Sequence, residues 1–292
     1  MSFPLAGKTA IVTGGAGGIG FAVASRFARE GSSVVLVGRS QRNLEMASDK
    51  LKSSIPTTGI TPIQQHAHFR MSVDKPQDWE RLAAKYPKTH YLINCAGETQ
   101  RSLLFQLSQE GINEQLSINL SGAIYGARYV GKNMARLATA QRIAAAKSAA
   151  SSTKLPEDDD HADLKDEDKG VSPSSACIIN ISSLLAYRAD KGTSVYAAAK
   201  SGLHGLTTSL AHELSRHRIR VNTVVPGYIL TNMTKGDHEP TGDIEKQSEL
   251  AERIPVGRFG TPDEVADAVA FLVKNEYANN CMLNLDGGLS AV

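Results

Sequence analysis

The stretch "TGGAGGIG", residues 13–20, joins the apolar run "KTAIVTG" (8–14) directly to the helical pattern "FAVASRFAREG" (21–31). Glycine permits sharp turns and lets a ligand approach the backbone closely. A glycine-rich turn that follows a strand and opens a helix is typical of dinucleotide binding, because the helix N-terminus attracts the pyrophosphate. The alternative is a tight turn without a ligand. The residues expected to line this site are Gly14, Gly18, Ile19 and Gly20.

Five further apolar runs of the same kind follow along the chain, separated by longer amphipathic stretches. They are "SVVLVG" (33–38), "THYLINCAG" (89–97), "ACIINIS" (176–182), "IRVNTVVPG" (219–227) and "CMLNLDGG" (281–288). Strands that are apolar on both faces and interrupted by helices indicate a parallel sheet covered on both sides. The sequence therefore predicts one α/β domain over residues 1–292, a Rossmann-type doubly wound sheet of about seven parallel strands with helices on both faces.

One segment interrupts this alternation. A helix is expected to end near Leu137, and residues 138–175 follow before the next strand. Eight of the residues from Glu157 to Lys169 are acidic, and few are apolar. Such a composition buries too little surface to offset the entropy of ordering. We interpret residues 138–175 as a disordered surface insertion that acts as a solvated spacer; the alternative is an acidic docking or regulatory loop.

Composition excludes several classes of protein. The 292 residues include 32 basic and 30 acidic side chains, a net charge of +2, which gives no overall field for nucleic acid or an anionic membrane. Cys95, Cys177 and Cys281 lie in apolar contexts without metal-ligand spacing, so we expect buried thiols of an intracellular protein and no metal site. The first strand is expected to begin by Lys8, which leaves no room for a cleavable targeting segment. Both the cytoplasm and the mitochondrial matrix are consistent with this expectation as the location of the protein.

The end of the second strand indicates the cofactor. Many dinucleotide folds carry an acidic residue there that binds the ribose 2′-hydroxyl, whereas this chain has Arg39, with Ser40 beside it. An arginine suits a 2′-phosphate, which favours NADP(H). The alternative is that Arg39 is an ordinary surface arginine. Small residues that end a later strand are expected beside the bound ribose: Asn94, Ala96 and Gly97.

A second group of residues has the character of a proton-transfer site. In "SVYAAAK" (194–200), Tyr196 and Lys200 lie one helical turn apart, and a nearby ammonium lowers the pKa of a phenol toward a value useful for catalysis. Ser183 follows the run 176–182, at the strand end where ligands collect, while Ser182 points to the other face. Asn119 places a side-chain amide within an apolar helix, where it must find hydrogen-bond partners. Both a structural and a functional role are consistent with this position.

Taken in order, these motifs resemble those of the short-chain dehydrogenase/reductase family, over essentially the whole chain apart from the acidic insertion. The motifs are "TGGAGGIG", "NCAG", Asn119, Ser183, "YAAAK" and "PG" at 226–227. The resemblance implies that Tyr196 protonates a carbonyl oxygen during reduction. Lys200 would lower the phenol pKa and bind the nicotinamide ribose, Ser183 would stabilise the developing oxyanion, and Asn119 would hold a water chain that resupplies the proton.

The resemblance also extends to the cofactor and the substrate lid. In "PGYILT" (226–231), it implies that Pro226 and Gly227 lie at the cofactor, that Ile229 packs on the nicotinamide ring and that Thr231 contacts the carboxamide. Residues 232–250 would form a mobile lid. Where many relatives use an aspartate at the adenine, this chain offers Met71, Ser72 or the later Asp74.

Within the family, the sequence looks most like 3-oxoacyl-[acyl-carrier-protein] reductases and the mitochondrial carbonyl reductase related to them. The segments that carry this likeness are 218–234, 254–273 and 283–288. It implies NADPH-dependent reduction of a 3-oxoacyl to a 3-hydroxyacyl carrier-protein thioester in fatty-acid synthesis. The alternatives are a reductase or dehydrogenase of a free small ketone, sugar or polyol, and a non-catalytic NADP(H)-binding regulatory protein.

Two features bear on partners. A basic cluster suits the acidic face of an acyl carrier protein, or alternatively only complements the helix C-terminus: Arg216, His217, Arg218 and Arg220. The family resemblance implies a homotetramer, and the apolar end of the chain (281–292) is consistent with a buried final strand and an interface.

Overall fold

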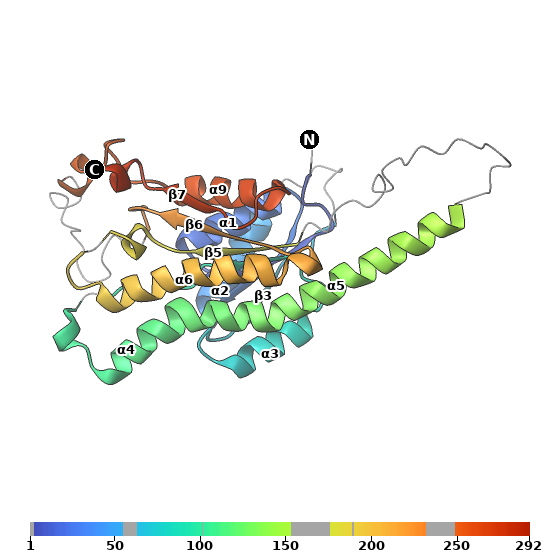
Figure 1. Ribbon diagram of the computed structural model, residues 1–292, viewed down its shortest axis with the longest axis horizontal. Helices are drawn as coiled ribbons and strands as arrows, with labels where there is room; N and C mark the ends of the chain where they lie inside the picture. The colour runs from blue at the N-terminus through green and yellow to red at the C-terminus, as the bar shows by residue number, and fades with distance from the viewer. Residues whose placement is uncertain (1–2, 55–62, 101, 153–175, 189, 232–248) are drawn as a thin grey trace.

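The structure is a computed structural model that describes residues 3–54, 63–100, 102–152, 176–188, 190–231 and 249–292. Its centre is a parallel sheet of seven strands in the order β3-β2-β1-β4-β5-β6-β7 (Figure 1). The strands are β1 (Thr9–Thr13), β2 (Ser33–Gly38), β3 (Ala67–Arg70), β4 (Tyr91–Asn94), β5 (Cys177–Ile181), β6 (Arg220–Pro226) and β7 (Met282–Leu285). The order reverses between β1 and β4, which confirms the doubly wound fold.

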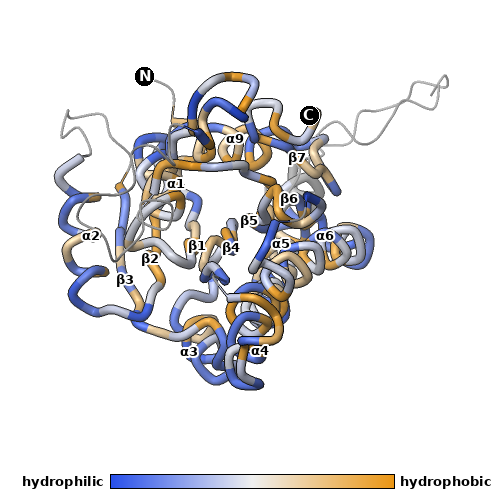
Figure 2. The backbone as a smooth tube through the Cα atoms, turned by 90° about the vertical axis from the view of Figure 1, so that its left-hand side faces the viewer, coloured by the Kyte–Doolittle hydropathy of each residue, from blue (hydrophilic) through white to orange (hydrophobic). Residues whose placement is uncertain are grey.

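Helices cover both faces of this sheet (Figure 2). The first layer is α1 (Gly18–Arg29), α2 (Gln41–Ser53) and α9 (Pro262–Lys274); the second is α3 (Pro76–Lys85), α5 (Gly122–Ser152) and α6 (Ser194–Glu213), with α4 (Gln109–Leu116) packed against α6. Strand β1 shows why both layers form. Its Ala10 and Val12 belong to the core beneath α1 and α9, whereas Ile11 packs in the core beneath α3 and α5. Alternate residues of one apolar strand thus serve two cores.

The sequence predicts about seven strands, but no apolar run marks the position of β3. It has four residues, including His68 and Arg70, and it lies at the sheet edge paired only with β2. None of its side chains is fully buried. Because an edge strand is half solvated, its sequence lacks the continuous apolar run that marks the inner strands.

Helix α5 corrects the expected start of the insertion. It was expected to end near Leu137 but continues to Ser152, and Figure 1 shows it extending beyond the sheet. Residues 138–152 contain neither glycine nor proline and are rich in alanine, which explains the continued helix. Residues 153–175 lie outside the described residues, and so do residues 232–248 of the expected lid. None of the helices described in the structure is long and apolar enough to cross a membrane.

Candidate active site

The glycine-rich turn after β1 has the backbone that a dinucleotide needs. Gly14 and Gly18 adopt positive φ values of 65° and 51°. A Cβ atom on Gly20 would lie 2.3 Å from the Gly14 carbonyl oxygen, and one on Gly14 would lie 3.2 Å from the Ala96 backbone. Side chains are therefore excluded at these positions, and the open backbone amides at the start of α1 fit a pyrophosphate.

The turn after β4 is held against this loop by a single hydroxyl. Thr13 Oγ1 accepts hydrogen bonds from the backbone N–H groups of Cys95 (2.9 Å) and Ala96 (3.0 Å). A Cβ atom on Gly97 would lie 2.9 Å from Asn119 Oδ1 and 3.3 Å from Lys200 Nζ. Asn94 lies at the base of this turn, where its amide donates to Asn180 Oδ1. The structure thus brings together residues that the sequence separates widely.

A pocket of about 240 Å³ lies beside these two turns. Its lining includes Gly14, Gly38, Arg39, Ser40, Met71, Ser72, Val73, Ala96, Gly97 and Glu98. Ser40 caps α2 by accepting the Asn43 N–H. Of the three residues considered for the adenine, Met71 and Ser72 line the pocket, whereas Asp74 does not. These residues fit the adenosine half of a dinucleotide.

A second pocket, of about 270 Å³, contains two of the predicted proton-transfer residues, Ser183 and Tyr196. It is lined by Ile19, Ser182, Ser183, Tyr196, Pro226, Gly227, Ile229 and Thr231, among others. A Cβ atom on Gly18 would lie 3.3 Å from Thr231 Cγ2, so the end of β6 closes onto the glycine-rich turn. The two pockets together follow the carboxyl ends of the strands, where open α/β sheets bind ligands.

The two serines after β5 play different parts. Ser183 hydrogen-bonds with the Tyr196 side chain. Ser182 points away: its hydroxyl donates to the Lys200 carbonyl (3.0 Å) and lies 2.9 Å from His204 Nε2. As the strand alternation predicted, Ser183 is placed at the phenol, and Ser182 ties β5 to α6.

The electrostatics of the pair on α6 differ from the prediction. Burial raises the pKa of Tyr196, with hydrogen bonding to Ser183 offsetting part of this effect, and burial lowers the pKa of Lys200 to about 8. The Lys200 ammonium donates to the Ile181 carbonyl (2.9 Å) and lies 5.6 Å from the centre of the Tyr196 ring. The expected lowering of the phenol pKa by Lys200 is therefore not observed, because desolvation dominates and the Lys200 ammonium donates its hydrogen bond to β5.

Asn119 sits in a short π-helix, Ser117–Ser121, between α4 and α5. Its Oδ1 accepts the Glu98 N–H (3.1 Å), and its Nδ2 donates to the Glu98 carbonyl (3.0 Å) and to Gln115. A π-bulge of this kind often marks a functional position. Asn119 is thus satisfied structurally, and it also borders a small cavity of about 10 Å³ that Lys200 shares.

Comparisons with known proteins agree with this geometry. Residues 8–157 match the family model described as short chain dehydrogenase, and residues 164–290 match one described as enoyl-(acyl carrier protein) reductase. Carbonyl reductase family member 4 of Xenopus laevis is 31% identical, over 97% of this chain and 98% of that protein. The 3-oxoacyl-[acyl-carrier-protein] reductase of Chlamydia muridarum is also 31% identical, over 99% and 100%.

The chain belongs to the short-chain dehydrogenase family. It is an NAD(P)-dependent oxidoreductase that acts on carbonyl or alcohol groups. A solved structure with a TM-score of 0.77 and 26% identity covers all of both chains; it is a Beutenbergia cavernae protein assigned as an NAD(P)-dependent gluconate 5-dehydrogenase, with NADP bound at low occupancy. Levodione reductase, at 24% identity with a TM-score of 0.79 over 99% of each chain, shares the fold.

Sequence reasoning on this short-chain dehydrogenase missed Gln100. Its buried Oε1 accepts hydrogen bonds from the backbone N–H groups of Val195 (2.8 Å) and Tyr196 (3.0 Å), at the first turn of α6. Thr193, the residue just before α6, makes no side-chain hydrogen bond that would cap the helix. Gln100 therefore satisfies the helix N-terminus that carries Tyr196. A contact across 96 positions leaves no local sequence signal.

The predicted basic cluster needs a correction. Arg220 is only 8% exposed, and its guanidinium donates to the carbonyls of Leu272, Val273 and Ala278. It therefore caps the end of α9 and does not face a partner. Arg216, His217 and Arg218 lie beyond the C-terminus of α6, whose 20 residues separate them from the first turn by roughly 30 Å. These three residues therefore lie at the opposite end of α6 from Tyr196.

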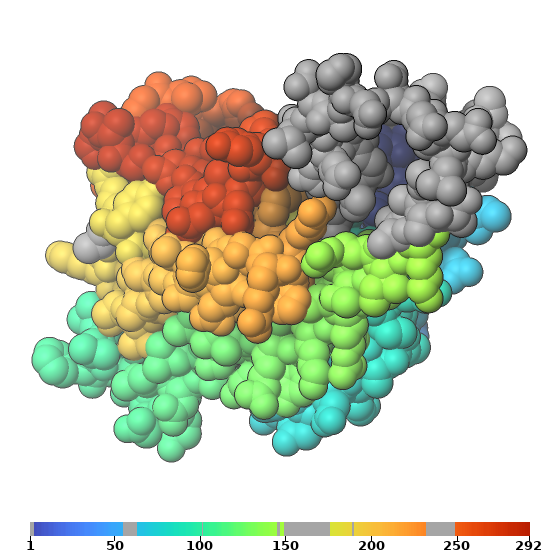
Figure 3. All heavy atoms as spheres, turned by 45° about the vertical axis from the view of Figure 1, so that its right-hand side comes forward, coloured from blue at the N-terminus to red at the C-terminus, as the bar shows by residue number. Residues whose placement is uncertain are grey.

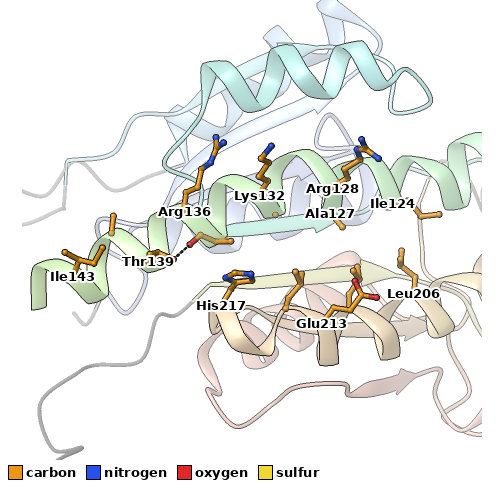
Figure 4. Close-up of a pocket in the computed structure, with 15 residues that line it drawn as sticks. Ile124, Ala127, Arg128, Lys132, Arg136, Thr139, Ile143, Leu206, Glu213 and His217 are labelled. Atoms are coloured by element: carbon orange, nitrogen blue, oxygen red, sulfur yellow. Dashed lines mark hydrogen bonds between the residues drawn. The ribbon is translucent and has the colours of Figure 1, made fainter. Parts of the chain in front are cut away.

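A larger groove, of about 800 Å³, lies between α5 and α6, and neither Ser183 nor Tyr196 lines it (Figure 4). Ile124, Leu206 and Leu210 give it an apolar lining, while Arg128, Lys132 and Arg136 line the α5 side. Figure 3 shows α5 in green alongside α6 in orange on this face. It contains none of the motif residues. Within the described residues, no group of His, Cys, Asp or Glu is arranged to hold a metal ion.

Proposed function

We propose that the protein reduces a 3-oxoacyl thioester to the 3-hydroxyacyl thioester with NADPH, carried on an acyl carrier protein. The observation that carries this proposal is the character of the pocket at Tyr196. Beyond the motif residues, its lining is mainly aliphatic and aromatic, with Leu184, Leu185, Tyr228, Leu250 and Phe259, and its polar members are the neutral Thr99 and Ser182. Among the described residues, no charged side chain lines this pocket. Such a surface suits a hydrocarbon chain, whereas a sugar or polyol needs several polar partners.

The residues present support the following chemistry. Bound NADPH supplies a hydride to the carbonyl carbon. Tyr196 donates its proton to the carbonyl oxygen, and its raised pKa keeps the phenol protonated for that role. The Ser183 hydroxyl, which is hydrogen-bonded to the same phenol, donates a hydrogen bond to the developing oxyanion.

Lys200 and Asn119 complete the proposed proton path. The small cavity that both residues border is of the size that one water needs. A water there would connect Lys200 with Asn119 and resupply the proton to Tyr196. The residues proposed to bind the cofactor are Gly14, Gly18 and Gly20 at the pyrophosphate, and Arg39 with Ser40 at the 2′-phosphate.

Two other functions are less well supported. A sugar or polyol dehydrogenase has in its favour the Beutenbergia cavernae neighbour, but the apolar pocket argues against it. A regulatory NADP(H)-binding protein has no use for a proton-transfer site, whereas this site brings together Ser183, Tyr196, Lys200 and Asn119.

We further propose that the reaction is intracellular, in the cytoplasm or the mitochondrial matrix. We also propose that the protein forms a homotetramer, for which light scattering of the purified protein is the test.

The decisive experiment follows NADPH oxidation with one acyl group in several forms. Acetoacetyl is offered as the carrier-protein thioester, the coenzyme A thioester and a simple ester, beside keto sugars, keto forms of gluconate and small ketones. We expect the carrier-protein thioester to have the highest kcat/KM. A higher kcat/KM for a sugar or a free ketone would contradict the proposed substrate and leave the reductase chemistry intact.

A further inference from the structure

An ion pair joins the two sides of the adenosine pocket. Arg39 Nη1 lies 2.5 Å from Glu98 Oε1. Arg39 follows β2 and Glu98 follows β4, and β1 lies between these strands in the sheet. The pair therefore spans the carboxyl end of β1, where the glycine-rich turn begins. Both residues line the same pocket of about 240 Å³.

The two partners differ in freedom to move. The side-chain amide of Asn119 holds the backbone of Glu98 through two hydrogen bonds. Asn119 Oδ1 accepts the Glu98 N–H (3.1 Å), and Asn119 Nδ2 donates to the Glu98 carbonyl (3.0 Å). Asn119 is itself only 2% exposed. The Arg39 side chain, by contrast, is 64% exposed, against 28% for Glu98. The carboxylate is thus the fixed partner, and the guanidinium is the partner that a ligand can draw away.

We propose that Glu98 sets the cofactor preference by competing with the 2′-phosphate of NADP(H) for the Arg39 guanidinium. The inference rests on the proposed function, in which Arg39 binds that phosphate. A phosphate that approaches Arg39 must share or displace the carboxylate, and the two anions repel one another. NAD(H) has no 2′-phosphate and leaves the ion pair intact. Glu98 therefore weakens the binding of NADPH but not that of NADH, and it reduces the difference in affinity between the two cofactors.

The size of the effect follows from the exposure of the pair. A partly exposed ion pair is worth less than about 1 kcal/mol, so a phosphate can displace it. Removing the carboxylate charge is expected to tighten NADPH binding by about three- to fivefold. This change in Kd corresponds to the free energy of such an ion pair. NADH binding should change by less than about twofold.

Direct titration of the full chain with NADPH and with NADH tests this, in the absence of any carbonyl substrate and with nucleotide fluorescence as the readout. Glu98→Gln keeps the shape and removes the charge. Glu114→Gln, on an exposed position of α4, removes an equal charge away from the pocket and is the matched control. Arg39→Gln and the double variant complete a cycle. Melting curves verify that each variant is folded.

The proposal predicts tighter NADPH binding in Glu98→Gln, no change in Glu114→Gln, and no gain from Glu98→Gln once Arg39 is glutamine. Unchanged or weaker NADPH binding in Glu98→Gln, beside a clear loss in Arg39→Gln, would overturn the role of Glu98 alone. Unchanged NADPH binding in Arg39→Gln would instead remove the phosphate role of Arg39 and this inference with it. The substrate does not enter the measurement, so failure of the carrier-thioester assignment would leave the result standing.

Discussion

The ammonium of Lys200 lies 5.6 Å from the centre of the Tyr196 ring and donates its hydrogen bond to the Ile181 carbonyl. The helical spacing therefore places the cation beside the ring, while its hydrogen bond goes to the last residue of β5. Burial lowers the pKa of Lys200 to about 8 and raises that of Tyr196. Both side chains are held between α6 and β5, and their charge states follow from desolvation.

The lowered pKa of Lys200 predicts a pH dependence for reduction. Below about pH 8 the ammonium is charged and available to the nicotinamide ribose and the proton path. As the pH rises through that value the proton is lost, so kcat/KM for NADPH should fall. Tyr196 stays protonated over this range, because its pKa is raised. Lys200→Met should lower the rate and abolish the inflection. A wild-type profile that is flat well above pH 8 would contradict this assignment.

The adjacent serines should separate catalysis from stability. Ser183→Ala removes a donor at the proposed oxyanion, and kcat is expected to fall by about 10²- to 10³-fold. Ser182→Ala removes the bond to the Lys200 carbonyl and should lower the free energy of unfolding by about 1 kcal/mol, with a much smaller loss of kcat. Steady-state kinetics and urea unfolding of both variants provide the comparison. A larger loss of kcat in Ser182→Ala would reverse the two roles.

Gln100 should act on Tyr196 through the helix terminus. Gln100→Ala leaves two N–H groups of α6 without their acceptor, and the free energy of unfolding should fall by about 1–2 kcal/mol. The rate should fall as well, because Tyr196 loses its backbone anchor. Gln100→Glu retains an acceptor beside the positive helix end and should recover part of both losses. Equal kcat in wild type and Gln100→Ala would show that the anchor does not position Tyr196.

Arg39 should decide which dinucleotide binds better. In Arg39→Asp the guanidinium is replaced by a carboxylate at the end of β2, which accepts a ribose 2′-hydroxyl and repels a 2′-phosphate. The ratio of kcat/KM for NADPH to that for NADH is expected to shift toward NADH by at least about tenfold. An unchanged ratio would mean that the 2′-phosphate is bound elsewhere.

The sequence was sufficient for the parts of the fold and site that depend on local pattern. Strand β1 and the turn after it are recognisable because residues that serve two cores, such as Ile11 and Val12, precede glycines that no side chain can replace. Tyr196 and Lys200 are recognisable because one helical turn joins them.

Other features depend on contacts between distant segments, which no local pattern reveals. Arg220 reads as a surface cation beside Arg218, yet carbonyls of α9 and the loop after it bind it in the interior. Glu98 and Gln100 follow β4 as ordinary polar residues, and only the fold shows that they contact Arg39 and the start of α6. The opposite shifts of the Tyr196 and Lys200 pKa values likewise arise from burial, which the helical spacing alone does not determine.

The role of Tyr196 as the general acid is tested most directly by the turnover of Tyr196→Phe with acetoacetyl carrier-protein thioester, measured beside the affinity of this variant for NADPH. The substitution removes the phenol oxygen and keeps the ring that Lys200 faces. We expect kcat to fall by about 10²- to 10⁴-fold, as for loss of a general acid, while the Kd for NADPH changes by less than about twofold. A near-normal kcat with intact NADPH binding would show that another group protonates the carbonyl oxygen.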